Sequence, residues 1–328
     1  MSKSNDIYYM TSNIALLKSQ LPPALTQALG LRSEGLNIFE LGLRPSLLEG
    51  PQNIKEFIAD HGIPNLTKPK DFIIYLKELE MKVGTWRALL TGLMVISDGA
   101  GRDLIKEGFE VFDNLRSQVP QPADSERKLN AFFEATKERF TYGNADNGII
   151  QGMKNFSLDP SVEGNEIGSC IVAASIFALI MMSHGFVVGE EHRIERHHSV
   201  AIVQSPQAGL FMFSRSPGKP YFKKFELELS CILSSALSFI PALINYQCFL
   251  AVPELGPNQP GEKELRALLQ RLDLVEALNP YFATLYDLRA SIYERLGDRE
   301  QERINIRFGN ALCSWANLIN RPVVLPFS

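Results

Sequence analysis

Hydrophobic residues recur at every third or fourth position through most of the first 120 residues, a spacing typical of helices with one buried face. In "KPKDFIIYLKELEMKVGTWRALLTGLMVI", Phe72, Ile73 and Leu76 mark such a face, and "GRDLIKEGFEVFDNLRSQV" repeats the pattern. The two prolines of "PQPAD", residues 120–124, interrupt it. We therefore predict a helical N-terminal region over residues 1–120.

From residue 125 onward, helical spacing and strict alternation follow each other. "SERKLNAFFEATKERFTYG" predicts a helix, and a long polar connection then leads to "EIGSCIVAASIFALIMM", residues 166–182. After a turn and the charged loop "EEHRIERH", the segments "HSVAIV" and "GLFMFS" alternate as two strands joined by "QSPQAG". "RSPGKPY" is predicted as a loop and "FELELSCILSSALSFIPALI" as a helix. This mixture predicts an α+β core over residues 125–255.

The remainder, residues 256–328, has helical spacing throughout. "LYDLRASIYERLGDREQERINIRFGNAL" is similar to one tetratricopeptide unit, but Glu302 stands where that repeat has a small residue. Because a single unit has no neighbouring repeat to bury its faces, we predict a plain helical hairpin. The expected fold class is α+β, with helical extensions on both sides of the core.

Composition narrows the possible partners and the cellular location. The chain has a net charge of −4 and no block of lysine and arginine, which argues against nucleic acid as the main partner. Its four cysteines have no zinc-like spacing, so we expect reduced thiols. The N-terminus has no apolar core of signal-peptide length. We therefore expect a cytoplasmic protein, with secretion by a signal-independent machine left open.

Two charge-free segments, residues 167–189 and 229–253, are long enough to cross a bilayer. The second contains several serines and two prolines, and the first ends in a turn followed by a strand-like patch. We therefore predict no membrane span, and a membrane-associated helical protein is the alternative. A metal site at His192, His197 and His198 with the neighbouring glutamates fits no familiar zinc spacing, so we predict neither metal nor cofactor.

The chemistry that the sequence suggests centres on Cys170, which follows a Gly-Ser pair at the start of the most apolar helix. Unpaired N–H groups at a helix N-terminus favour the thiolate form of cysteine. A cysteine nucleophile also needs a base, usually histidine. His198 opens a strand, and its alternation with apolar residues leads us to expect that it faces the thiol-bearing helix. A slip of one residue would place His197 there instead.

The order "FTYG…GSC…HSVAIV…GLFMFS" resembles the transglutaminase-like branch of the papain-type cysteine enzymes. The two strands and the loop after them equally resemble the type III effector cysteine proteases of pathogenic bacteria. The resemblance as a whole covers about residues 129–225, and the part shared with the effector proteases is its tail, residues 198–225. It implies a papain/transglutaminase-like core, with Cys170 as nucleophile and His198 as base.

In both families an acid orients the histidine and stabilises its charged form. Its position falls on Ser214, whose hydroxyl accepts a hydrogen bond but cannot offset a positive charge. Glu226 and Glu190 are the other acids that we consider. The side chain of Asn165 or Gln151, with the backbone N–H of the cysteine, is the candidate oxyanion hole.

Two functions of different classes therefore follow from the sequence. The first is thiol-dependent acyl transfer on a protein substrate, as in a protease, a deamidase or a transglutaminase, through a thioester on Cys170. The alternative is a catalytically inactive papain-like fold that binds another protein. Ser214 at the acid position favours the alternative. An ordinary buried core cysteine at position 170 is the plainest interpretation of the thiol.

Overall fold

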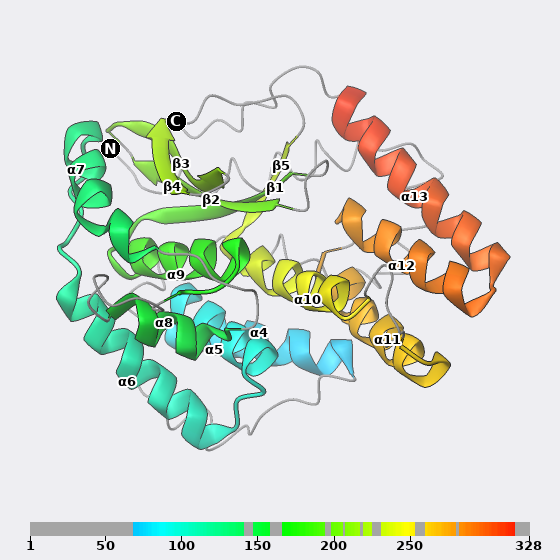
Figure 1. Ribbon diagram of the computed structural model, residues 1–328. Helices are drawn as coiled ribbons and strands as arrows, with labels where there is room; N and C mark the ends of the chain where they lie inside the picture. The colour runs from blue at the N-terminus through cyan, green and yellow to red at the C-terminus, as the bar shows by residue number, and fades with distance from the viewer. Residues whose placement is uncertain are drawn as a thin grey trace.

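The computed structural model describes residues 68–140, 147–157, 166–193, 198–205, 207–216, 219–224, 231–252, 260–279 and 282–318. These residues form an α+β fold in which helices predominate (Figure 1). The first two helices are α4 (Pro69–Val83) and α5 (Thr85–Ser97). Gly84 separates them, with φ +87° and ψ +163°. That conformation is open almost only to glycine, so the apolar spacing continues across Gly84 while the helix does not.

The next helices lead to the sheet. Helix α6 (Arg102–Gln118) is followed by α7 (Glu126–Thr136) and a short 3-10 turn. Helix α8 (Ile149–Ser157) lies in the segment predicted as an irregular connection, so that prediction is wrong there. Helix α9 (Cys170–Ser183) begins at the cysteine, as predicted.

Five antiparallel strands form one sheet: β1 (Val187–Arg193), β2 (His198–Ser205), β3 (Gly209–Ser216), β4 (Lys219–Lys224) and β5 (Cys231–Ser235). Their order across the sheet is β4-β3-β2-β1-β5. The predicted strands "HSVAIV" and "GLFMFS" are confirmed as parts of β2 and β3.

Three sequence predictions around the sheet are wrong. The charged loop "EEHRIERH" supplies the second half of β1, and most of the loop "RSPGKPY" belongs to β3 and β4. The single helix predicted over residues 225–244 is divided: β5 comes first, and α10 (Phe239–Leu250) starts only after a 3-10 turn. Pairing with a neighbouring strand accounts for these differences, because β1 hydrogen-bonds to both β2 and β5.

Helices α9 and α7 cover one face of the sheet (Figure 1). The ring of Phe177 in α9 stacks on Phe213 in β3 with centroids 4.2 Å apart, and Phe133 in α7 stacks on Phe222 in β4 at 5.7 Å. On β2, Ala201 and Val203 belong to this side. The other face carries a separate buried cluster of Val200, Ile202 and Met212.

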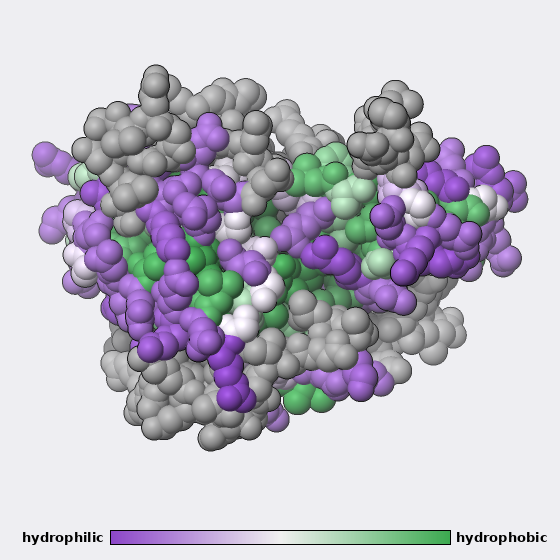
Figure 2. All heavy atoms as spheres, turned by 60° about the horizontal axis from the view of Figure 1, so that its bottom comes forward, coloured by the Kyte–Doolittle hydropathy of each residue, from purple (hydrophilic) through white to green (hydrophobic). Residues whose placement is uncertain are grey.

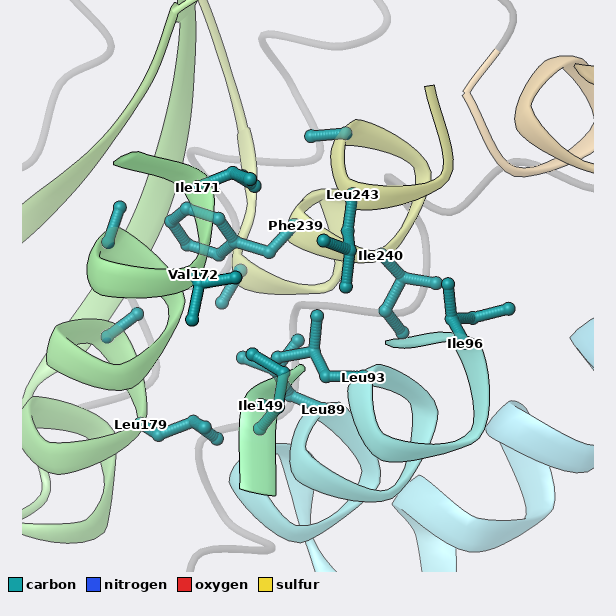
Figure 3. Packing of buried hydrophobic residues seen from close by; sticks show 14 of the residues in the cluster. Leu89, Leu93, Ile96, Ile149, Ile171, Val172, Leu179, Phe239, Ile240 and Leu243 are labelled. Atoms are coloured by element: carbon teal, nitrogen blue, oxygen red, sulfur yellow. The ribbon is translucent and has the colours of Figure 1, made fainter. Parts of the chain in front are cut away.

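A single hydrophobic cluster extends from Phe72 in α4 to Leu312 at the other end of the described chain. It includes residues from all three regions that the sequence suggested. Figure 3 shows its centre, where side chains of α5, α8, α9 and α10 meet. The start of α9 lies in this centre, because Ile171 and Val172 point toward Phe239 of α10.

The C-terminal helices are α11 (Glu262–Leu278), α12 (Ala283–Leu296) and α13 (Arg299–Leu318). Helices α12 and α13 form the predicted hairpin, and Gly297 ends α12 in the left-handed conformation with φ +75°. Between α11 and α12, the buried Arg289 donates to Glu276 at 2.6 Å and also to Asp273.

None of the helices within the described ranges is long and apolar enough to cross a membrane. The face seen in Figure 2 carries hydrophobic areas between hydrophilic ones. Among the described residues, large apolar side chains are exposed on α4, β1, α10 and α13: Ile74, Met81, Val187, Phe249, Leu250 and Ile306.

Candidate functional site

Cys170 is the first residue of α9 and differs from the rest of that helix in its exposure. It is partly exposed, whereas every later residue of the helix, from Ile171 to Ser183, is buried. Ser169 precedes the helix in an extended conformation and makes no side-chain capping hydrogen bond. Its buried Oγ has no hydrogen-bond partner among the described residues. The thiol therefore stands at a helix N-terminus that its capping residue does not close.

The backbone leading to Cys170 packs tightly against α8. Gly168 has φ +129°, and a Cβ at this position would lie 3.3 Å from Cβ of Asn147. A Cβ on Gly152 in α8 would lie only 2.7 Å from the backbone oxygen of Ile167. Gly152 leaves no room for a Cβ against this backbone oxygen, and Gly168 is favoured because its positive φ is one that residues with a side chain rarely adopt.

Two amide side chains converge on the backbone oxygen of Glu166. The Nδ2 of Asn147 donates to it at 2.7 Å, and the Nδ2 of Asn155 donates to the same atom at 2.5 Å. Gln151, a candidate for the oxyanion hole, is exposed on α8 and donates to Oδ1 of Asn155 at 2.7 Å. The amide of Gln151 is thus part of the network that holds Glu166.

The start of α8 is capped by the end of α5. The backbone N–H of Ile149 donates to Oγ of Ser97 at 3.0 Å and to Oδ2 of Asp98 at 3.1 Å. Burial raises the pKa of the Asp98 carboxyl, and the hydrogen bonds from Ser97 and from the backbone of α8 act in the opposite direction. The partly buried carboxylate of Asp98 satisfies N–H groups at the start of α8 that the helix itself leaves open.

The structure places His198 at the start of β2, opposite Arg193 of β1. Backbone position 198 alternates in register with Val200 and Ile202, whose side chains belong to the cluster on the face away from α9. The expectation that this face meets the thiol-bearing helix is therefore wrong. Alternation defines two faces, but it does not tell which of them a helix covers.

The two acid positions lie on opposite faces of the sheet. Ser214 is 2% exposed and shares its face with Met212, away from α9. Glu190 is fully buried on β1 opposite Ala201, on the face that α9 covers. The register therefore brings positions 198 and 214 to one face, and Glu190 to the other.

Asn165, Glu226 and His197 lie outside the described residues. Cys248 in α10 is buried, and burial raises the pKa of its thiol to about 11. Cys170 and Cys248 thus differ clearly in exposure. Within the described ranges, no group of three or more histidine, cysteine, aspartate or glutamate side chains could hold a metal.

Asn147, Asn155 and Asp98 were not predicted as part of this site. The sequence "NADNG" around Asn147 suggests a turn, but it does not show that the amide reaches a residue 19 positions away. Asp98 likewise reaches a helix about 50 positions along the chain, and local sequence carries no signal for such a contact.

No family model, no curated protein and no solved structure matches this chain.

Proposed function

We propose that the N-terminus of α9 is a thiol-dependent acyl-transfer site that acts on protein substrates, with Cys170 as the nucleophile. The observation that carries this proposal is the exposure of Cys170 at the first position of a helix whose other residues are all buried. A helix N-terminus lowers the pKa of a thiol by stabilising the anion, and the thiolate is the reactive form.

The reaction follows from the chemistry of a thiolate. Sulfur attacks the acyl carbon of an amide, and the backbone N–H groups of the first helical turn stabilise the negative oxygen that forms. The histidine holds the proton that the thiol lost when the thiolate formed. The carbon–nitrogen bond then breaks, the leaving amine takes this proton from the histidine, and a thioester remains on Cys170. Water or a second amine then resolves the thioester. Water gives hydrolysis or deamidation, and an amine gives transamidation.

The base in this proposal comes from the start of β2. On β2, Ala201 and Val203 lie on the α9 side, whereas backbone position 198 alternates with Val200 and Ile202 on the other side. His197 lies outside the described residues. Separate substitutions of His197 and His198 test the two candidates.

The proposal includes a papain/transglutaminase-like core. Its support is the order of elements: a helix headed by cysteine, followed by antiparallel strands, one of which begins with histidine, with the helix packed on the sheet.

A test is the reaction of the protein with a peptide p-nitrophenyl ester, followed by intact mass and nitrophenol release. We expect an acyl adduct on Cys170 that forms and is turned over, and that is absent in Cys170→Ala. His197→Ala and His198→Ala should show which base is used, because only the variant lacking the base loses turnover. An adduct that never turns over, or turnover that is unchanged in Cys170→Ala, would contradict the proposal.

A second candidate function is a non-catalytic module that binds another protein. Ser214 favours it, because a serine stands where the resembled enzymes carry an acid, and apolar side chains such as Ile74, Met81 and Phe249 are exposed. The substitution Ser214→Asp separates the two candidates. If position 214 is the acid position of a working site, Asp should raise ester turnover. If it is structural, Asp should only destabilise the sheet, because it would bury a charge at a position that is 2% exposed.

A further inference from the structure

We propose that Asn147 and Asn155 are positioning residues for Cys170. They hold the backbone in front of α9 so that the helix N-terminus and the thiol keep a fixed relation. This inference rests on the proposed thiol function, and it adds two residues that do not touch the substrate.

The amide side chains of Asn147 and Asn155 bind the same atom. The backbone oxygen of Glu166 accepts from Nδ2 of Asn147 at 2.7 Å and from Nδ2 of Asn155 at 2.5 Å. A carbonyl oxygen has two lone pairs, so two donors saturate it. Asn147 precedes α8 and Asn155 lies within it, so the oxygen is held from two points of the α8 segment.

The chain between Glu166 and Cys170 is short and closely packed. Ile167 is fully buried, and its backbone oxygen approaches Gly152 too closely for any side chain there. Gly168 packs against Asn147 in a conformation that other residues rarely adopt. Ser169 is 4% exposed. The chain between the Glu166 oxygen and the first turn of α9 therefore has little room to adjust, so a displacement of that oxygen also displaces the first turn.

The network does not cap the helix N-terminus. The amides bind a carbonyl oxygen upstream of the helix, and Ser169 makes no side-chain capping hydrogen bond to the first turn. Fixing the approach while leaving the terminus uncapped is what a site of this kind requires.

The test measures iodoacetamide alkylation of Cys170 as a function of pH, with peptide mapping, in the full-length chain. The variants are Asn147→Ala, Asn155→Ala and the double variant. Lys154→Ala is the matched control, because Lys154 also lies on α8 and its side chain binds Glu107 rather than the Glu166 network. We expect the double variant to show a raised thiol pKa and about three- to tenfold slower alkylation at neutral pH. Lys154→Ala should change little.

Because both amides bind one oxygen, the change in alkylation rate in the double variant should differ from the sum of the changes in the two single variants. Asn155→Gln, which keeps a donor amide, should recover part of the rate, whereas a purely space-filling role would not distinguish Gln from Leu at position 155. Circular dichroism should show that every variant is folded.

The outcomes separate this inference from the proposed function. If Cys170 reacts selectively in the wild type and equally fast in the double variant, the positioning role is wrong and the thiol function stands. If Cys170 is no more reactive than Cys248 in the wild type, the thiol function is wrong. Hydrogen exchange at residues 169–172 then decides the positioning role: faster exchange in the double variant supports it, and unchanged exchange overturns it.

Discussion

Asp98 offers the sharpest test of how the site is supported, because it caps α8 from the end of α5. Its Oδ2 accepts from the N–H of Ile149 at 3.1 Å and of Ile150 at 3.5 Å. Replacing a capping acceptor by alanine typically costs about 0.5–2 kcal/mol. Ile149 keeps Ser97 as a second acceptor at 3.0 Å, and the bond to Ile150 is long. We therefore expect Asp98→Ala to lower the free energy of unfolding by about 1 kcal/mol.

Asp98→Asn keeps an oxygen acceptor at the same place and removes the charge, so it should cost less than Asp98→Ala. Burial raises the pKa of Asp98 above its usual value of 3.8, so the folded state binds this proton more tightly than the unfolded state. The contribution of Asp98 to stability is then largest at low pH and falls as the pH rises through 3.8 to the raised value. Relative to Asp98→Asn, the wild type should therefore lose stability over that interval.

The assay is urea unfolding followed by circular dichroism across a pH series, with hydrogen exchange at Ile149 and Ile150. Asp103→Ala is the control, because Asp103 is an exposed acid in the first turn of α6. Equal stability of Asp98→Ala and the wild type would refute the capping argument. A difference between wild type and Asp98→Asn that is independent of pH would refute the argument about the raised pKa.

Three further predictions concern stability. Burial, and then the charge of Arg116, hold the pKa of His184 below 6.5, so the free energy of unfolding should fall as the pH drops below 6.5. In urea titrations over a pH series, His184→Gln should lack this part of the pH dependence. Equal pH dependence in the wild type and the variant would contradict the prediction. Arg289→Ala should lower the free energy of unfolding in urea by about 3–5 kcal/mol, because Glu276 would keep a buried charge without its cation. The double variant Arg289→Met with Glu276→Gln should recover part of that stability. A further loss of stability in the double variant would contradict the prediction. Gly84→Ala should lower the stability to thermal unfolding by about 1–3 kcal/mol, because φ at this position is +87°. Gly101→Ala should be nearly neutral, because φ is −79° and the space around this position is open. Equal effects of the two substitutions would refute the strain at Gly84.

The elements that the sequence predicted well are those whose signal is local. The start of α9 at Cys170 and the alternation in β2 and β3 follow from neighbouring residues, and both are confirmed. Helix α8 was missed because its capping groups, Ser97 and Asp98, come from another helix. Strand β5 was predicted as helix because an apolar run does not reveal that β1 offers it a partner edge.

The residues of the candidate site also fall into those that local sequence predicts and those that depend on the whole fold. The helix-start cysteine could be predicted, because position in a helix is a local property. The face of the sheet that His198 shares could not, because packing of α9 on Ala201 and Val203 rather than on Val200 depends on the whole core. The amides of Asn147 and Asn155 became part of the site only when the fold brought them to Glu166.

Whether Cys170 is an activated thiol is measured by the pH profile of its alkylation. Native protein is treated with iodoacetamide over a pH series, and the modified cysteines are mapped, with Cys248 as the internal reference because its pKa is raised to about 11. We expect Cys170 to be labelled selectively near neutral pH, with an apparent pKa below the usual value for cysteine of about 8.5. Labelling of Cys170 that is no faster than that of Cys248, or that rises only above pH 8.5, would contradict it.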